Sequence, residues 1–296
     1  MHKTANRIIT WLCACASLLF AVATASSAPA YRDEMVNVRG TLMHFRVYPG
    51  DARTVLMEAG SGEGHERWNE LAPRILATTG ATVISYDRAG FGSSEPLTTP
   101  YDIHDEVSRL HAGLYALGRD QWLVLVGHSY GGYLIQLYSN LYPGDVRGLV
   151  YVDADTVQSI DAVDAAAMVV KSIKAKERLD ASPTERASLR HARAFVATHE
   201  TMRRYPVVCN VPVSVLTADI VWPDGSKAER EGWVEGHRQL ALASNGRWIV
   251  AKGAGHMLQV DRPDIVLETL HQVLADVPRR GASLGVVGQA CAKPPR

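Results

Sequence analysis

Short apolar runs alternate with helical patterns along most of this chain. Residues 122–126 are apolar at every position and residues 146–152 at most positions, and a segment with helical spacing lies between the two runs. Strands that are buried on both faces occur mainly in parallel sheets that helices cover on both sides. The sequence therefore predicts an α/β fold with a mainly parallel central sheet flanked by helices.

The remaining elements follow the same alternation. A hairpin is expected around Arg39-Gly40, because two β-patterned runs flank this dipeptide. Further strands are expected at residues 54–59, 81–86, 213–216 and 248–250. Helices are expected at residues 68–79, 102–117, 133–141, 227–244 and 263–275. Helical and strand signals of this kind come from the 3.6-residue and two-residue periods of apolar positions.

One segment interrupts the alternation. Residues 156–205 are rich in alanine, charged residues and helix formers and carry no strand signal. We expect them to form a helical cap that is inserted into a core made of residues 31–155 and 206–278. Residues 279–296 form a tail with little apolar periodicity.

The first thirty residues have the features of a secretory signal peptide. Lys3 and Arg7 precede an apolar run, and small residues follow with cleavage patterns that end at Ala25 and at Ala30. A basic start, an apolar middle and a small-residue cleavage site mark such a leader, whereas a membrane anchor needs about 20 apolar residues. We therefore expect residues 1–30 to be removed and the protein to be periplasmic or extracellular.

Charge and composition exclude several classes of partner. The chain has 31 Lys and Arg residues against 31 Asp and Glu residues, so it has no broad basic field for nucleic acid or anionic lipid. Hydrophobic residues make up 47% of the chain, which is enough for a sizeable core and excludes a disordered chain. We expect no nucleic-acid partner and no stable membrane insertion after the leader is cleaved.

The cysteines favour a disulfide over a metal site. Two of the four lie in the predicted leader, which leaves Cys209 and Cys291. An even pair in an exported protein predicts a disulfide bond, although two free thiols are the alternative. The histidines show no H-x-x-x-H or HExxH spacing, so no metal site is expected.

The strongest chemical signal is the pentapeptide Gly127-His128-Ser129-Tyr130-Gly131. It lies between an expected strand and an expected helix, where small residues two positions either side of the serine permit a very tight turn. Such a turn presents the serine hydroxyl at the carboxyl end of the sheet, above the positive end of the following helix. We predict that Ser129 is a nucleophile and that His128 is a packed neighbour and not a base.

A serine nucleophile needs an adjacent base and an acid that orients the base. His256 is the best candidate for the base, because it follows the strand expected near residue 250 and its loop opens at the same edge of the sheet. Two acids satisfy the chain order Ser, Asp, His. Asp153 and Asp219 each follow an expected strand, and both remain candidates at this point.

These residues together resemble the α/β-hydrolase superfamily, over nearly the whole mature chain. The motifs that carry the resemblance are Glu58-Ala-Gly-Ser-Gly62, Tyr86-Asp-Arg-Ala-Gly-Phe-Gly-Ser-Ser94, the pentapeptide around Ser129, and Gly255-His256. In that family a His-Gly loop donates one oxyanion-hole amide, and Ala59-Gly60 occupies its place here. The resemblance therefore implies backbone N–H groups of Ser61 and Tyr130 as the oxyanion donors.

The resemblance also bears on the acid. The family's usual acid position falls on Val221 in this sequence, and Asp219 comes two residues early. Haloalkane dehalogenases and pancreatic-type lipases use an acid at the end of the preceding strand, which is the place of Asp153. The resemblance therefore favours Asp153, with Asp219 as the alternative.

The expected activity is hydrolysis of a small-molecule carboxylic ester through an acyl-enzyme. Lactonase, thioesterase, aminopeptidase and cofactor-free haloperoxidase activities are alternatives on the same triad, and a non-catalytic ligand-binding protein of the same fold is a further one. Serine at the nucleophile position argues against epoxide hydrolase and dehalogenase chemistry, for which the family uses aspartate. No cofactor is expected, because His65 replaces the last glycine of a GxGxxG pattern that begins at Gly60.

Overall fold

The computed structural model describes residues 31–160, 165–167, 169–170, 173, 181–220 and 226–277. The predicted leader at residues 1–30 and the predicted tail at residues 279–296 lie outside this part of the chain. Among the described residues, every helix is too short or too polar to cross a membrane.

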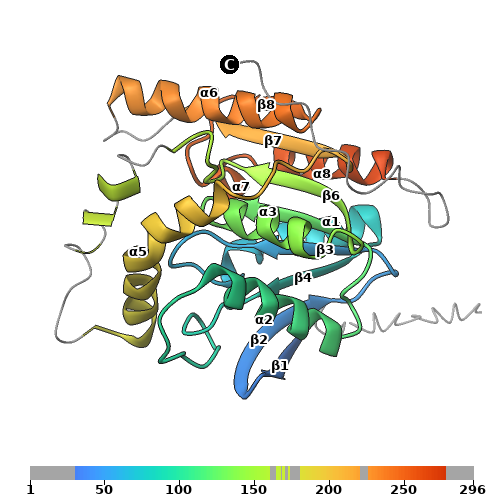
Figure 1. Cartoon of the computed structure of the whole chain (residues 1–296). Coiled ribbons are helices and arrows are strands. Elements are labelled where there is room, and N and C mark those ends of the chain that lie inside the picture. The colour runs from blue at the N-terminus through green and yellow to red at the C-terminus, as the bar shows by residue number, and fades with distance from the viewer. Residues whose placement is uncertain are drawn as a thin grey trace, which may run out of the picture.

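The described part of the chain forms one eight-stranded, mostly parallel sheet (Figure 1). The strands lie in the order β1-β2-β4-β3-β5-β6-β7-β8. Strand β2 pairs antiparallel with β1 and with β4, and all other neighbours are parallel. The strands are β1 (Arg32–Val38), β2 (Thr41–Tyr48), β3 (Thr54–Glu58), β4 (Thr82–Tyr86), β5 (Leu123–His128), β6 (Val146–Val152), β7 (Val213–Ala218) and β8 (Arg247–Ala251). The predicted α/β fold with a mainly parallel sheet is confirmed.

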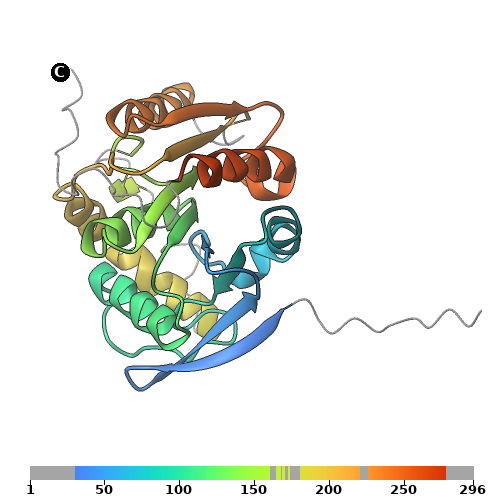
Figure 2. The same ribbon diagram turned by 90° about the vertical axis from the view of Figure 1, so that its right-hand side faces the viewer.

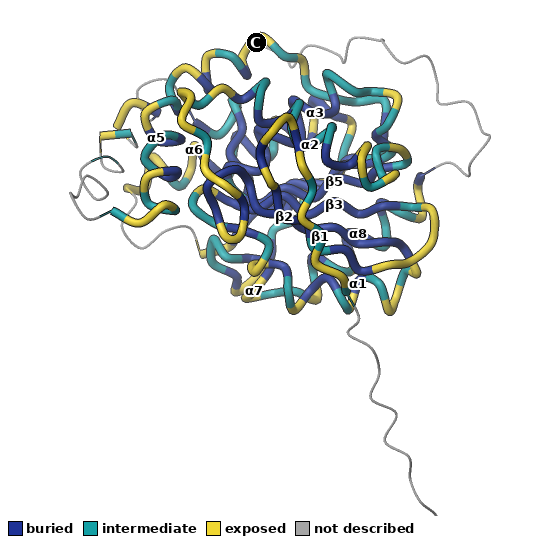
Figure 3. Tube along the Cα trace, turned by 90° about the horizontal axis from the view of Figure 1, so that it is seen from below, coloured by how far each residue is buried: buried dark blue, intermediate teal, exposed yellow. Residues whose placement is uncertain are grey.

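Helices cover both faces of the sheet, as Figure 2 shows from the side. One face packs against the 3₁₀ helix η1 (His65–Trp68), α1 (Leu71–Thr79), α7 (Leu258–Asp261) and α8 (Pro263–Asp276). The other face packs against α2 (Ile103–Ala116), α3 (Gly131–Leu141) and α6 (Lys227–Ala243). The central strands are therefore buried on both sides, which Figure 3 shows in dark blue and which explains their continuous apolar runs.

The first two strands form the predicted hairpin. Arg39 and Gly40 have φ angles of 54° and 82°, which is the left-handed backbone that a two-residue hairpin turn of type I′ requires. The side-chain oxygen of Asn37 accepts a hydrogen bond from the Gly40 N–H at 2.9 Å and so supports the turn. Local sequence alone is enough to specify this connection.

Helix α5 (Pro183–Met202) lies within the segment predicted to form a cap. Ser182 begins it with a capping box, because its side chain accepts from the Glu185 N–H while the Glu185 side chain accepts from the Ser182 N–H. In Figure 1, α5 stands outside the end of the sheet and beside α3. Residues 165–167, 169, 170 and 173 are also helical, and the rest of residues 161–180 lies outside the described part of the chain.

Candidate active site

The pentapeptide around Ser129 forms the predicted tight turn between strand β5 and helix α3. Ser129 has a φ of 50°, an uncommon conformation for a residue with a side chain that costs about 1–3 kcal/mol. A Cβ on Gly127 would lie 2.6 Å from the carbonyl oxygen of Gly131, and a Cβ on Gly131 would lie 2.7 Å from that of Glu58. The glycines are therefore required because main chain passes too close for any side chain.

His256 and Asp153 meet beyond the carboxyl ends of two strands. His256 lies in the loop after β8, and Asp153 directly follows β6. The His256 Nδ1 donates a hydrogen bond of 2.7 Å to Asp153 Oδ2, between residues 103 positions apart in the chain. Such a bond fixes the imidazole so that Nε2 is left to accept a proton.

The second oxygen of Asp153 is held independently of the histidine. Asp153 Oδ1 accepts hydrogen bonds from the main-chain N–H of Ala218 and from the indole N–H of Trp233, each at 2.9 Å. The Asp153 side chain is completely buried, so these two donors and His256 replace the water that a free carboxylate would bind. Helix α6, through Trp233, therefore helps to orient the acid.

The two partners shift each other's ionisation in opposite directions. Burial raises the pKa of Asp153, but the hydrogen bond from His256 and the nearby imidazoles outweigh it, so the pKa lies below its ordinary value. Burial lowers the pKa of His256, but the hydrogen bond to Asp153 and the charges of Asp153, Asp155 and Glu63 raise it above its ordinary value. The pair thus favours an ionised acid beside a more basic imidazole.

The alternative acid, Asp219, lies in different surroundings. Its carboxylate is exposed and binds the Lys252 ammonium at 3.0 Å and the Gly253 N–H at 3.3 Å. It therefore anchors the loop that leads to His256 but does not occupy the hydrogen-bonding position on His256 Nδ1. Val221, the usual acid position in the resemblance, lies outside the described residues.

The loop after β3 is fixed by a buried arginine. The Arg88 guanidinium donates to Glu58 Oε1 at 2.6 Å and to the carbonyl oxygen of Ala59 at 2.7 Å, and it also donates to the carbonyl oxygen of Gly60. Arg88 and Glu58 are each 1% exposed, so this ion pair is stable only because further hydrogen bonds satisfy both partners. The orientation of the peptides before Ser61 is thereby set.

This loop lies directly beside the predicted nucleophile. A Cβ built on Gly60 would lie 3.2 Å from the Cβ of Ser129, so the main chain of the loop touches the turn. Within the described part of the chain, no acceptor is paired with the main-chain N–H of Ser61 or of Tyr130. Tyr130 also stands at the N-terminus of α3, where the helix dipole favours negative charge.

His128 contacts the main chain of His256. The His128 imidazole is 1% exposed, and its Nε2 donates to the carbonyl oxygen of His256 at 2.9 Å. Its Nδ1 lies 3.4 Å from the Glu63 carboxylate. His128 is thus placed as a packed neighbour in the turn, which is the position that the sequence predicts for it.

Three residues near the pair escaped sequence analysis. Trp233 and His237 stand four residues apart on α6, and their helical spacing marks a buried face without saying what it contacts. His237 is completely buried, with Nδ1 3.1 Å from Thr217 Oγ1 and Nε2 donating to the Ala154 carbonyl. Asp155 is the third; burial raises its pKa to about 7, partly offset by the charge of His256.

Asp155 also contacts the turn at Ser129 through its main chain. Its N–H donates to the carbonyl oxygen of Ser129 at 2.8 Å, and its own carbonyl blocks any side chain at Gly132. Two carboxyl groups, Asp153 and Asp155, therefore follow β6 near one imidazole. Their pKa values are shifted in opposite directions, so Asp153 is ionised at neutral pH while Asp155 is only partly ionised.

Comparison with known proteins identifies the family. A model of the alpha/beta hydrolase family matches residues 55–269, which include the turn at Ser129, Asp153 and His256. The chain belongs to the alpha/beta hydrolase family. Members of this family are typically hydrolytic enzymes, and their substrates are typically small molecules.

The relatives of this hydrolase differ in their named activities. It is 25% identical to the uncharacterized protein YqjL of Bacillus subtilis over 86% of this chain and 97% of that protein. It is 30% identical to a proline iminopeptidase of Thermoplasma volcanium, over only 40% of this chain and 41% of that protein. Among solved structures, an esterase (EaEST) from Exiguobacterium antarcticum aligns with a TM-score of 0.62 and 18% identity, over 81% of this chain and 98% of the esterase. These similarities establish the fold and the family, but no single substrate.

Proposed function

We propose that the protein is an exported serine hydrolase that cleaves carboxylic esters with Ser129, His256 and Asp153. The observation that carries the proposal is the 2.7 Å hydrogen bond from His256 Nδ1 to Asp153 Oδ2. It supports the assignment because it orients the other imidazole nitrogen at the same sheet edge as the glycine-flanked turn of Ser129. In this proposal Asp219 only anchors a loop.

The mechanism follows from the roles that these groups would have. The Ser129 hydroxyl attacks the acyl carbonyl while His256 Nε2 accepts its proton, and the N–H groups of Ser61 and Tyr130 stabilise the oxyanion. His256 then protonates the leaving alkoxide as the tetrahedral intermediate collapses to an acyl-enzyme. Water attacks the acyl-enzyme with His256 as the base, which releases the acid and restores Ser129. Asp153 stabilises the imidazolium that forms in each half of the reaction.

The cap favours acyl groups of small or medium size. Phe195 of α5 lies over Tyr130 and Tyr133, with ring centroids 6.1 Å apart in each pair. The Tyr133 hydroxyl also hydrogen-bonds to His199 Nδ1 at 2.9 Å, which ties α5 to α3. We expect a helix docked this closely to Tyr130, the residue after Ser129, to limit the volume beside the nucleophile.

The test is covalent labelling combined with turnover. The purified protein should react with a fluorophosphonate probe and hydrolyse p-nitrophenyl esters of short and medium acyl chains. Ser129→Ala should fold normally, lose labelling and lose about 10⁴- to 10⁶-fold in kcat, and His256→Ala should lose labelling at neutral pH. Ser108→Ala, on helix α2, is the matched control and should retain both activities.

Two outcomes would contradict the proposal. Rapid ester turnover by Ser129→Ala, once contaminating esterases are excluded, would show that another group is the nucleophile. A wild-type protein that neither labels nor turns over any ester would support a non-catalytic ligand-binding protein. Lactones, thioesters and aminoacyl amides in the same panel distinguish ester hydrolysis from the related acyl-transfer activities.

Export is the second part of this proposal. N-terminal sequencing of protein from the exported fraction should begin after Ala25 or Ala30, where the small-residue patterns end. The same protein should carry a disulfide between Cys209 and Cys291, although Cys291 lies outside the described residues. Intact-mass analysis after alkylation under denaturing, non-reducing conditions is the measurement. Two alkylated cysteines would exclude the bond, and an uncleaved N-terminus would exclude the leader.

A further inference from the structure

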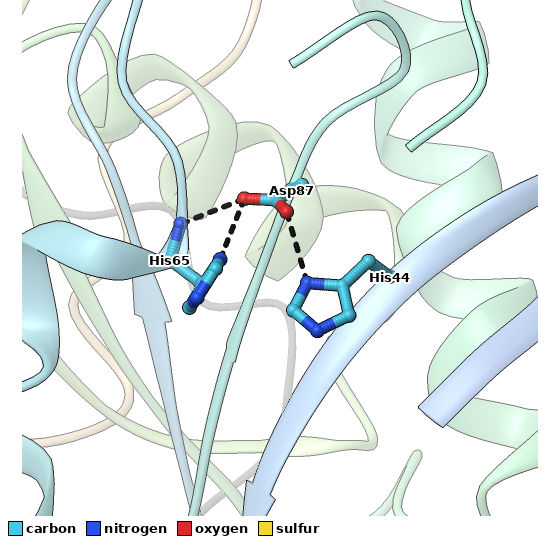
Figure 4. A group of neighbouring side chains, drawn as sticks. All are labelled: His44, His65 and Asp87. Atoms are coloured by element: carbon cyan, nitrogen blue, oxygen red, sulfur yellow. Dashed lines mark hydrogen bonds and ion pairs between the residues drawn. The ribbon is translucent and has the colours of Figure 1, made fainter. Parts of the chain in front are cut away.

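Two histidines and an aspartate from distant parts of the chain meet outside the predicted triad (Figure 4). His44 comes from β2, His65 begins η1, and Asp87 directly follows β4. Their potential metal-ligand atoms all lie within 4.8 Å of one another. In the described part of the chain, this is the cluster of three or more His, Cys, Asp or Glu side chains that could hold a metal ion. No local spacing in the sequence indicates this group, because each member belongs to a different segment.

Both imidazoles present the same nitrogen to one carboxylate. His44 Nδ1 lies 2.9 Å from Asp87 Oδ2, and His65 Nδ1 lies 3.0 Å from Asp87 Oδ1. Figure 4 shows both rings on the same side of the carboxylate. Each imidazole is thus bonded to a different oxygen of one carboxylate, and together they provide two nitrogens and one carboxylate, a ligand set that binds first-row metal ions.

The remaining nitrogen of His44 is held by a second carboxylate. His44 Nε2 lies 3.0 Å from Asp33 Oδ1, and the Arg46 guanidinium donates hydrogen bonds of 2.8 Å and 3.0 Å to the Asp33 carboxylate. Histidines that bind metals usually donate their other ring N–H to a carboxylate, which fixes the ring and makes the ligating nitrogen more basic. Asp33 and Arg46 supply this support for His44.

Asp87 is rigidly placed by the main chain around it. Its two oxygens accept from the N–H groups of His65 and Ser93, each at 2.9 Å. A Cβ on Gly64 or on Gly92 would lie 2.3 Å or 2.2 Å from these oxygens, so the two loops close around the carboxylate without side chains. The carboxylate is thus preorganised, and only the histidine side chains must move to bind an ion.

Charge and access also suit a cation. Both nitrogens of His44 face carboxylates, so this imidazole donates twice and must release the Nδ1 proton to an incoming ion. Once it does, Asp33 and Asp87 carry two negative charges against the single positive charge of Arg46, which leaves the ligand group anionic. The Asp87 side chain is fully buried, but the side chains of His65 and Asp33 are 15% and 44% exposed, so an ion can enter from the surface. Bonds of about 2.0–2.2 Å to one ion place tetrahedrally arranged ligand atoms about 3.3–3.6 Å apart, so ligand atoms that now lie within 4.8 Å of one another must approach by at most about 1.5 Å.

We propose that His44, His65 and Asp87 form a binding site for a divalent first-row metal ion, with zinc as the ion that this ligand set suits best. The ion replaces the two imidazole-to-carboxylate hydrogen bonds and is bound by both Nδ1 atoms and the Asp87 carboxylate, with water completing its coordination. It joins β2, the end of β4 and the segment that follows Ser61. Its role is therefore structural, and it takes no part in the proposed ester chemistry.

The test is direct binding of zinc to the purified, full-length protein after treatment with EDTA. Calorimetric titration with ZnCl₂ should give one equivalent of bound zinc, and a hundredfold excess over Kd should raise Tm by roughly 5 °C or more. His65→Ser should abolish the one-equivalent phase, while its hydroxyl can still donate to Asp87. His271→Ser removes a histidine on α8 whose Nε2 hydrogen-bonds to Thr78 Oγ1 at 2.9 Å, away from the proposed ligands, and it should bind zinc like the wild type.

A milder variant keeps the test decisive if His65→Ser folds poorly. Asp33→Asn leaves all three ligands in place but weakens the support of His44, and it should reduce zinc affinity about 10- to 100-fold. The proposal is overturned if the wild type binds no zinc. It is also overturned if His65→Ser binds zinc as tightly as the wild type, or if neither His65→Ser nor Asp33→Asn changes the affinity.

Discussion

Replacement of Asp153 by asparagine should abolish the proposed ester hydrolysis without unfolding the protein, and the structure supplies the reason. Asp153 Oδ1 faces two fixed donors, the Ala218 N–H and the Trp233 indole N–H, each at 2.9 Å. The asparagine carbonyl must take this position, because an amide NH₂ there would face two N–H groups. The NH₂ group then lies against His256 Nδ1, where the carboxylate oxygen now accepts at 2.7 Å.

This exchange forces the wrong tautomer on the base. Facing an NH₂ group, His256 Nδ1 must accept, so the imidazole carries its proton on Nε2 and has no lone pair for the Ser129 proton. The equivalent change lowers kcat by about 10⁴ in serine proteases, and 10⁴ corresponds to about 5.4 kcal/mol of transition-state stabilisation. Both Oδ1 hydrogen bonds persist, so Tm should change by less than about 5 °C.

The assay compares Asp153→Asn with Asp219→Asn, its matched control. Each variant is measured for kcat on a p-nitrophenyl ester and for Tm by calorimetry. Asp219 binds Lys252 and Gly253 and not the imidazole, so its variant should retain kcat within about threefold. The reasoning is refuted if Asp153→Asn keeps more than a tenth of the wild-type kcat, or if the large loss with an intact fold belongs to Asp219→Asn.

Two further predictions follow from the same geometry. The charge of Asp155 helps to raise the pKa of His256, and His256 can accept a proton only when it is neutral. Asp155→Asn should therefore move the acid limb of the kcat/KM profile to lower pH, and a limb that is unchanged or shifted upward between pH 5 and 8 would contradict this. Gly127→Ala should lower the free energy of unfolding by about 1–3 kcal/mol, because its Cβ would lie 2.6 Å from a carbonyl oxygen. A Cβ on Gly232 of α6 would meet nothing within 4 Å, so Gly232→Ala should raise the free energy of unfolding by up to about 1 kcal/mol. Denaturant titrations measure both variants, and equal changes in the free energy of unfolding would argue against the steric explanation.

Sequence reasoning succeeded where the determining contacts are local. The hairpin at Arg39-Gly40, the turn at Ser129 and the buried parallel strands each depend on residues within one short segment, and the structure contains all three. Positive φ angles, glycine spacing and apolar runs are properties of a few neighbouring residues. They act before any distant contact forms, so they can be recognised from the chain alone.

The tertiary structure decided what depends on distant partners. Asp153 and Asp219 both follow strands and are equivalent in chain order, yet only Asp153 lies at His256 Nδ1, although Asp219 follows β7, the strand that pairs with β8. Asp219 binds Lys252 and Gly253 instead, while the Ala218 N–H at the end of β7 holds Asp153. Register and loop closure determine which of two such carboxylates reaches the imidazole. The same holds for His44, His65 and Asp87, whose three segments become neighbours only when β2 pairs with β4. The sequence by itself determined the fold class and the tight turn at Ser129, whereas tertiary contacts between distant segments determined which side chains surround each imidazole.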